Sequence, residues 1–279
     1  INMKHISVVL CIVLLASAAS MALAGGRVMP WMCLERCNHT KSMILRELSQ
    51  VRANLDTIRA VAYEEFNLGP NCALVKNAFT PVGPTLSNWG VETYPMISSF
   101  PYPPDFLDWM RYCFANPENF IQNAVATAIN EGFTGYNVDW EPTTTATPED
   151  AASYAKFMDK FAKAMHAAGK KLTMAAATWN PIWNLQLLGQ TDIDKIMTMS
   201  TYTANFTTFK TKLAQAVQQV PLSKLGIGLE DDTATVISET EIQQRVAMIQ
   251  ELGVKEIDVW QAPIPDMWME YLTKFASTA

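Results

Sequence analysis

Three pieces of residues 135–178 decide the fold: GYNVDWE at 135–141, PEDAASYAKFMDKFAKAMHAA at 148–168 and KLTMAAAT at 171–178. The first and last pieces are short and rich in apolar residues, as buried strands are. The middle piece repeats its apolar residues with the 3.6-residue period of an amphipathic helix. The stretch therefore predicts a strand, a helix and a second strand, which is the repeating unit of α/β folds.

The predicted helix at 148–168 is bounded by residues that start and stop helices. Thr147 can cap the N-terminus with its hydroxyl, and Pro148 suits the first helical position. The acidic pair at 149–150 lies in the first turn, where negative charge meets the positive end of the helix dipole. Gly169 follows the last apolar residue, where a glycine typically ends a helix.

The same alternation continues in both directions along the chain. Strands are expected at 28–33, 58–63, 92–98, 135–141, 171–178, 196–202, 224–229 and 256–260. Helices are expected at 41–54, 104–114, 118–131, 148–168, 206–220, 239–252 and 266–276. Residues 67–80 carry Asn, Gly and Pro without a helical period, which predicts a long loop.

Eight expected strands, nearly all separated by helices, predict a single (β/α)8 TIM barrel of class α/β. Residues 25–279 are expected to form this one domain, because barrels of about 250 residues are commonly undivided. A doubly wound open sheet is the alternative. It is less favoured because no G-x-G-x-x-G motif or P-loop follows any strand.

Residues 1–24 are expected to be a secretory signal peptide. Lys4 precedes the apolar run at 8–16, and Ala-Leu-Ala at 22–24 offers the small residues of a cleavage site. The apolar run is short for a membrane span. We therefore expect a secreted protein that does not associate with membranes, with lysosomal or vacuolar delivery as the alternative.

The composition argues against a nucleic-acid partner. The chain of 279 residues has 21 basic and 27 acidic residues, a net charge of −6, and no cluster of Lys or Arg. An acidic surface repels phosphate. With 49% apolar residues the chain resembles an ordinary globular protein, and we expect a monomer.

Four of the five cysteines lie outside the expected signal peptide. They are Cys33, Cys37, Cys72 and Cys113. In an oxidising compartment they predict two disulfides, and the sequence leaves all three pairings open. A zinc site is the alternative, disfavoured because only His39 and His166 remain as histidine ligands and no C-x-x-C pair exists. Possible N-glycosylation motifs begin at Asn38 and Asn205.

The strand at 135–141 carries the candidate chemistry. Because strand side chains alternate, Asn137, Asp139 and Glu141 share one face. Three polar groups on an inner face are costly unless they are partnered or used. Pro142 cannot continue the strand's hydrogen bonding, so Glu141 is expected at the barrel rim, where active sites lie. A solvent-exposed acid pair is the alternative.

Thr134 to Glu141 resembles the glycoside hydrolase family 18 signature, D-G-x-D-x-D-x-E, on the fourth strand of such a barrel. Gly135, Asp139 and Glu141 match its fixed positions. Thr134 replaces the first Asp and Asn137 replaces the second. The resemblance implies a secreted glycosidase that cleaves β-linked N-acetylglucosamine in chitin or in N-glycan cores.

Two carboxylates that flank a scissile bond in a retaining glycosidase lie about 5 Å apart on opposite sides of it, which neighbours on one strand face cannot do. Family 18 enzymes use the substrate's own N-acetyl carbonyl as nucleophile. The resemblance therefore implies that Glu141 is the general acid and then the base, and that Asp139 holds the acetamido N–H. Asn137 lacks the charge of the family's Asp, which implies a changed pH optimum or weaker catalysis. No metal or organic cofactor is implied.

Further sugar contacts follow from the same resemblance. The expected substrate-binding residues are Asn137, Trp260, Tyr202, Ser98 and Trp179. Trp260 ends the last strand, where the family places a Trp under the sugar, although core packing is an alternative. Ser98 matches one position of the family's S-x-G-G element. Tyr202 resembles the tyrosine of the M-x-Y-D element but comes one residue late, and core packing is the alternative. Trp179 and Trp183 follow the fifth strand and either line a sugar groove or pack their own loop.

Two other functions stay open. Glu230 ends the seventh strand, and a glutamate there with Glu141 is the layout of two-glutamate retaining barrels, although Glu230 also suits a solvated acidic loop. The departures at Thr134 and Asn137 also allow an inactive, chitinase-like lectin. The short stretch 229–239 leaves no room for an added lobe, so a shallow groove for a short carbohydrate is expected.

Overall fold

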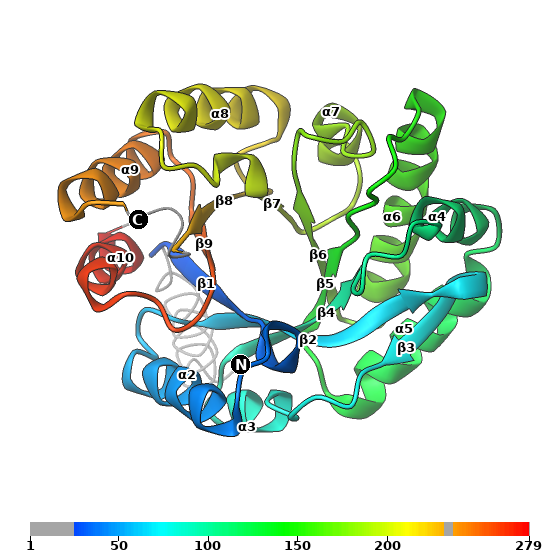
Figure 1. The fold of residues 1–279 in the computed structure, drawn as a ribbon, viewed down its shortest axis with the longest axis horizontal. Helices are drawn as coiled ribbons and strands as arrows, with labels where there is room; N and C mark the ends of the chain where they lie inside the picture. The colour runs from blue at the N-terminus through cyan, green and yellow to red at the C-terminus, as the bar shows by residue number, and fades with distance from the viewer. Residues whose placement is uncertain (1–24, 232–236, 279) are drawn as a thin grey trace, which may run out of the picture.

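A computed structural model describes residues 25–231 and 237–278. Eight parallel strands form a closed barrel, which Figure 1 shows end-on inside a ring of helices. They are β1 (Arg27–Met32), β2 (Ala60–Gly69), β4 (Glu92–Ser98), β5 (Gly135–Asp139), β6 (Lys171–Ala176), β7 (Lys195–Thr198), β8 (Leu225–Glu230) and β9 (Glu256–Trp260). The barrel closes because β1 pairs with β9 on one side and with β2 on the other. The expected (β/α)8 barrel is confirmed.

The longer helices lie where the sequence predicts them, with ends within two residues of those expected. They are α2 (Lys41–Ala53), α4 (Phe106–Ala115), α5 (Glu118–Glu131), α6 (Pro148–Ala167), α8 (Phe206–Gln219), α9 (Glu239–Glu251) and α10 (Asp266–Thr278). At the start of α6, the Thr147 hydroxyl accepts from the Asp150 N–H at 3.2 Å, and Asp150 accepts from the Thr147 N–H at 2.8 Å. Gly169 follows this helix with φ of 68°.

The predicted loop at 67–80 is partly wrong. β2 runs on to Gly69, turns through η2 (Pro70–Cys72) and returns as the antiparallel β3 (Ala73–Lys76). Figure 1 shows this hairpin projecting outward past α4. The sequence does not distinguish this hairpin from a loop, because its turn at Pro70–Cys72 uses residue types that are also typical of loops. The short helices α3 (Gly83–Asn88) and α7 (Leu185–Gly189) were also missed, because one or two turns show no helical period.

The disulfides expected from the four cysteines are present, and the structure selects one of the three pairings. Cys33 joins Cys37 around the turn η1 (Leu34–Cys37), directly after β1. Cys72 joins Cys113, which ties the β2–β3 hairpin to α4. Residues 1–24, the expected signal peptide, lie outside the described residues. Within 25–231 and 237–278 no helix has both the length and the apolar character that crossing a membrane requires.

The side chains of β5 point alternately outward, to the helices, and inward, to the barrel interior. Its outward residues pack on the helices: the Tyr136 hydroxyl donates to the Ala124 carbonyl of α5 at 3.0 Å. Trp140 stacks on Tyr154 and Phe157 of α6, with ring centroids 5.9 and 5.3 Å apart. Asn137 and Asp139, on the other face of the strand, point into the barrel, as the sequence predicts.

Gly135 begins β5 where two strands approach closely. A Cβ atom added to Gly135 would lie 2.2 Å from the Lys171 carbonyl oxygen of β6. Only glycine fits there without moving one of the strands. This gives a physical reason for one fixed position of the motif.

Candidate active site

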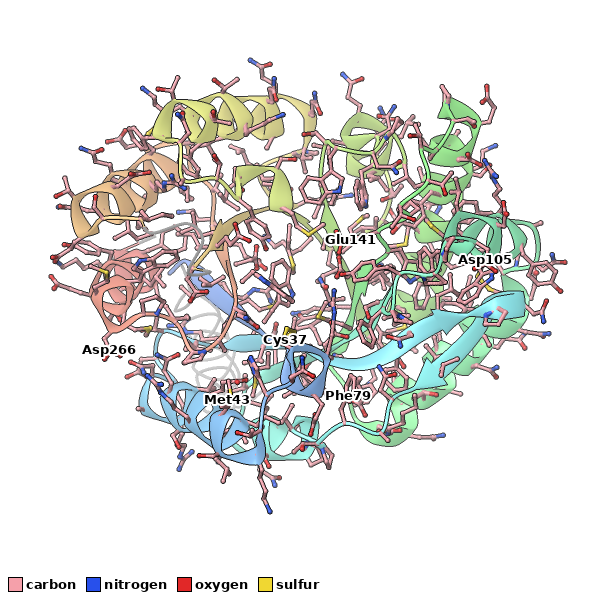
Figure 2. The ribbon with its side chains drawn as sticks, in the orientation of Figure 1. Cys37, Met43, Phe79, Asp105, Glu141 and Asp266 are labelled. Atoms are coloured by element: carbon pink, nitrogen blue, oxygen red, sulfur yellow. A yellow bond between two sulfur atoms is a disulfide. The ribbon has the colours of Figure 1, made fainter. Side chains whose placement is uncertain are left out.

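A cavity of about 210 Å³ opens at the carboxyl ends of the barrel strands. It is lined by Trp31, Arg36, Met96, Tyr102, Asp139, Glu141, Ala175, Trp179, Met199, Tyr202, Glu230 and Trp260. Figure 2 shows Glu141 inside the ring of strands, whereas Met43 and Asp266 lie on the surrounding helices and Asp105 lies just before α4. In a TIM barrel this is the end at which active sites lie.

The acid pair lies where β5 ends. Asp139 is the last residue of the strand and is 3% exposed. The strand was expected to reach Glu141, but the Glu141 N–H donates to the Ser99 hydroxyl at 3.2 Å instead of joining the strand ladder. Glu141 therefore sits in the first loop residues above the strand, on the cavity wall.

Two side chains from other loops contact the acid pair. A guanidinium nitrogen of Arg36 lies 3.8 Å from Asp139 Oδ2. The Tyr102 hydroxyl donates to Glu141 Oε1 at 3.3 Å. Asp139 Oδ1 is buried and has no hydrogen-bond partner within the described part of the chain. The hydrogen-bonding capacity of this oxygen is therefore unused by the described residues.

Burial dominates the electrostatics of the pair. It raises the pKa of Glu141 to about 8, with a further contribution from the Asp139 charge, while Arg36 and the Tyr102 hydrogen bond oppose the rise. Burial also raises the pKa of Asp139, and Arg36 again opposes the rise. The two carboxyls interact strongly, so their titration belongs to the pair. Glu141 is thus protonated near neutral pH, as a general acid must be.

Aromatic rings form the other walls of the cavity. Trp31 at the end of β1 meets Trp260 at the end of β9, with centroids 5.9 Å apart, and meets Tyr202 at 6.4 Å. The Tyr202 hydroxyl is buried without a partner among the residues that the structure describes. It lies here because β7 ends at Thr198 and the turn η3 (Met199–Thr201) intervenes, which corrects the expected strand at 196–202.

Trp179 and Glu230 lie on the same cavity. Trp179 is 59% exposed and packs edge-on against the buried Trp183, with centroids 5.6 Å apart. Of the expected tryptophan pair, one ring is therefore open to solvent and the other packs the loop. Glu230 ends β8 and is partly exposed.

Ser98 and Asn137 are not on the cavity wall. The Ser98 hydroxyl lies 3.0 Å from Glu64 and 2.9 Å from the Asn67 side chain. The Asn137 amide nitrogen contacts Thr173 at 3.1 Å and the Met197 sulfur at 3.2 Å, inside the barrel. Asn137 lies two residues below Asp139 in β5, whereas Ser98 is level with Asp139 but turns to Glu64 and Asn67. Sugar contact by either side chain stays a prediction.

Thr134, the other departure from the motif, lies at the opposite end of β5. Its hydroxyl accepts from the Thr93 N–H at 3.0 Å, and its own N–H donates to the Thr93 hydroxyl at 3.3 Å. The substitution there serves the junction between β4 and β5, far along the strand from Glu141.

Trp31, Arg36 and Tyr102 were not singled out from the sequence, although all three line the cavity. Trp31 could have been found, because it lies near the end of the strand expected at 28–33, in the register that faces the interior. Arg36 and Tyr102 lie in irregular loops and carry no periodic signal. Within the described ranges no group of three His, Cys, Asp or Glu residues is arranged to hold a metal ion.

No protein-family model and no characterised protein sequence matches this chain significantly. Solved structures do match it by shape. A chitinase from Chromobacterium violaceum has a TM-score of 0.75 at 15% identity, over 91% of this chain and 100% of that one. The Bacillus megaterium spore cortex-lytic enzyme SleL has a TM-score of 0.76 at 13% identity, over 92% and 75%.

A glycoside hydrolase family 18 N-acetylglucosaminidase from Paenibacillus barengoltzii has a TM-score of 0.65 at 12% identity, over 89% of this chain and 99% of that one. At such identities the likeness is one of fold. The chain has the fold of the chitinase, of SleL and of the family 18 N-acetylglucosaminidase, in agreement with the motif at 134–141.

Proposed function

We propose that the protein is a glycosidase that cleaves β-linked N-acetylglucosamine by substrate-assisted, retaining catalysis. The observation that carries the proposal is the placement of Asp139 and Glu141 on one cavity with Trp260. The fold shared with chitinases supports the same reading.

In the first step the acetamido carbonyl oxygen of the substrate attacks its own anomeric carbon. The glycosidic bond breaks, and its oxygen takes the proton of Glu141. In the second step Glu141 removes a proton from water, and the hydroxide oxygen attacks the anomeric carbon and opens the oxazolinium ring. Glu141 is protonated again at the end of the cycle. Its pKa of about 8 suits the first step near neutral pH.

Asp139 accepts the acetamido N–H through Oδ1, which has no partner among the residues that the structure describes. This hydrogen bond orients the carbonyl and stabilises the positive charge that develops on the ring. Trp260 and Tyr202 offer an apolar face and a hydroxyl to the sugar, and the exposed Trp179 extends the surface at the rim. At about 210 Å³ the cavity is smaller than the roughly 300–1,000 Å³ of common ligand sites, which favours a short carbohydrate over a long one.

Turnover of a fluorogenic chitobioside by the wild type and by Glu141→Gln tests the proposal. We expect Glu141→Gln to lose at least about a hundredfold in kcat, because the amide cannot donate the proton. The matched control is Glu149→Gln, the same change at an exposed residue in the first turn of α6. It is expected to keep wild-type rates. Equal activity of Glu141→Gln and wild type would refute the assignment.

A lectin is the second candidate, favoured by the neutral Asn137 below Asp139. A wild type that binds N-acetylglucosamine oligomers without releasing the fluorophore would establish it. Both candidates predict binding at the same cavity, so binding alone does not separate them.

A two-glutamate mechanism is the third candidate, favoured by Glu230 on the cavity that holds Glu141. Azide with Glu230→Ala separates it from the substrate-assisted route. Recovery of activity with formation of a glycosyl azide would identify Glu230 as the nucleophile. No recovery is expected if the substrate's acetamido group fills that role.

Secretion is part of the proposal. The disulfides Cys33–Cys37 and Cys72–Cys113 suit an oxidising compartment. Asn38 and Asn205 are exposed, as glycan acceptors must be. Mass spectrometry of protein secreted from a eukaryotic host, with and without glycosidase treatment, tests both sites.

A further inference from the structure

Arg36 lies in the turn η1 immediately after β1 and reaches the cavity. It is the basic residue among the described cavity-lining residues. The Cys33–Cys37 disulfide closes the turn around it. Its side chain is 9% exposed, so a charged group is held out of water at the centre of the site.

Rings and an acid fix the plane of this guanidinium. It lies over the rings of Phe100, Tyr102 and Trp260, at 5.9, 5.3 and 5.6 Å from their centroids. One nitrogen pairs with Glu64, a fully buried carboxylate of β2, and the other donates to the Tyr102 hydroxyl. Glu64 is held in turn by the Ser98 hydroxyl at 3.0 Å. Cation–π contacts and a buried ion pair both favour a single side-chain geometry.

This geometry links Arg36 to both acids. The nitrogen that pairs with Glu64 lies 3.8 Å from Asp139 Oδ2. The Tyr102 hydroxyl, which accepts from Arg36, donates its own proton to Glu141 at 3.3 Å. A buried chain of contacts therefore links Glu64 through Arg36 to Asp139 and, through Tyr102, to Glu141.

The neutral Asn137 side chain gives a reason for a cation beside Asp139. A charged neighbour at that position could share a proton with Asp139, but the Asn137 amide is neutral and contacts Thr173 and Met197. Asp139 is thus left buried beside Glu141, with Arg36 as the nearby opposite charge that the structure places on it.

We propose that Arg36 is a positioning residue for the acid pair: anchored by Glu64, it balances the charge of Asp139 and aims the Tyr102 hydroxyl at Glu141. The inference rests on the proposed function of this cavity. It adds a role for a residue outside the strand motif.

The charges around the pair set the sign of the expected effect. Glu141 faces Asp139, Arg36, Tyr102 and Glu64, and Glu230 and Tyr202 also line the cavity. Arg36 opposes the rise in pKa of both Asp139 and Glu141. Without the cation both pKa values rise further. Activity needs an ionised Asp139 and a protonated Glu141, so both limbs of the pH profile of kcat/KM move to higher pH.

The test compares wild type with Arg36→Gln, Arg36→Lys and Tyr102→Phe. We expect Arg36→Gln to lower kcat about tenfold or more and to move both limbs up by about one pH unit. Arg36→Lys keeps the charge and is expected to restore the limbs but not the full rate, because an ammonium cannot pair with Glu64 and orient Tyr102 together. Tyr102→Phe leaves the cation and is expected to raise the alkaline limb alone.

A second measurement does not depend on turnover. The Glu141 carboxyl is titrated by 13C NMR, its signal assigned by its loss in Glu141→Gln. Its pKa is expected to be higher in Arg36→Gln and unchanged in Arg52→Gln, a control on the outer helix α2. If the wild type shows no turnover, the proposed function fails while this titration still judges the role of Arg36. A folded Arg36→Gln, by circular dichroism, with unmoved limbs and an unmoved Glu141 pKa would overturn the inference.

Discussion

Trp140 connects the acid pair to the helical layer, and its replacement tests how far the core holds the site. Trp140 lies between Asp139 and Glu141 in the sequence. Its ring is fully buried and points outward, toward the helices. It stacks on Tyr154 and Phe157 at interplanar angles of 19° and 25°. It also meets Phe106 and Phe120 edge-on, at 6.4 and 5.8 Å.

The structure sets the magnitude. Truncating a buried Trp to Ala costs about 3–5 kcal/mol, and the ring pairs place Trp140→Ala toward the upper end. A domain of ordinary stability has about 5–15 kcal/mol in total, so the variant is expected to stay measurable but weakened. Urea unfolding followed by far-UV circular dichroism gives the change, provided that the m-value is unchanged.

Trp179→Ala is the matched control. It removes the same ring from a side chain that is 59% exposed, and it is expected to change the free energy of unfolding by less than about 0.5 kcal/mol. A loss of under about 1 kcal/mol in Trp140→Ala, or an equal loss in both variants, would refute the view that this aromatic cluster anchors β5.

Two further predictions concern stability. Burial raises the pKa of Glu47 to about 8, so between pH 4.5 and 8 the folded carboxyl holds a proton that the unfolded one releases, and stability falls as pH rises through that window. Glu47→Gln removes the titrating carboxyl. It is expected to raise stability by about 4 kcal/mol at pH 7.5, about three pH units above the unfolded pKa, and by little at pH 4.5. An equal shift of the urea midpoint at both pH values would contradict this. Gly135→Ala forces a methyl to 2.2 Å from the Lys171 carbonyl oxygen and is expected to cost about 3 kcal/mol of stability by the same assay. The control Gly90→Ala has open space around it and is expected to cost about 1 kcal/mol, because its φ is 77°. Equal losses would show that β5 and β6 move apart at little cost.

The sequence predicted most of the barrel because each βα unit has a local pattern. The eight strands and seven longer helices lie near their expected positions, since apolar periods of two kinds alternate along the chain. The β2–β3 hairpin was missed because its pairing extends beyond the barrel and is held by the Cys72–Cys113 disulfide, a contact across 41 residues.

The candidate site was predictable only where one strand carries it. Asp139 and Glu141 follow from the alternation of β5, and Trp260 from the end of β9. Arg36 was missed because its partners Glu64 and Tyr102 are 28 and 66 residues away, in a strand and a loop with no shared motif. The network forms only when the barrel closes and brings these segments to one rim.

Closure of the barrel also brings the two ends of the described chain together. β1 pairs with β9, and a Cβ atom on Gly25 would lie 2.0 Å from the Ala276 carbonyl oxygen. A short peptide linker could therefore join these ends, and new termini opened at the exposed Gly169 would lie at the rim opposite the cavity. Such a circular permutant should retain the cavity at the carboxyl ends of the strands, and it would offer attachment points for surface immobilisation on the opposite rim.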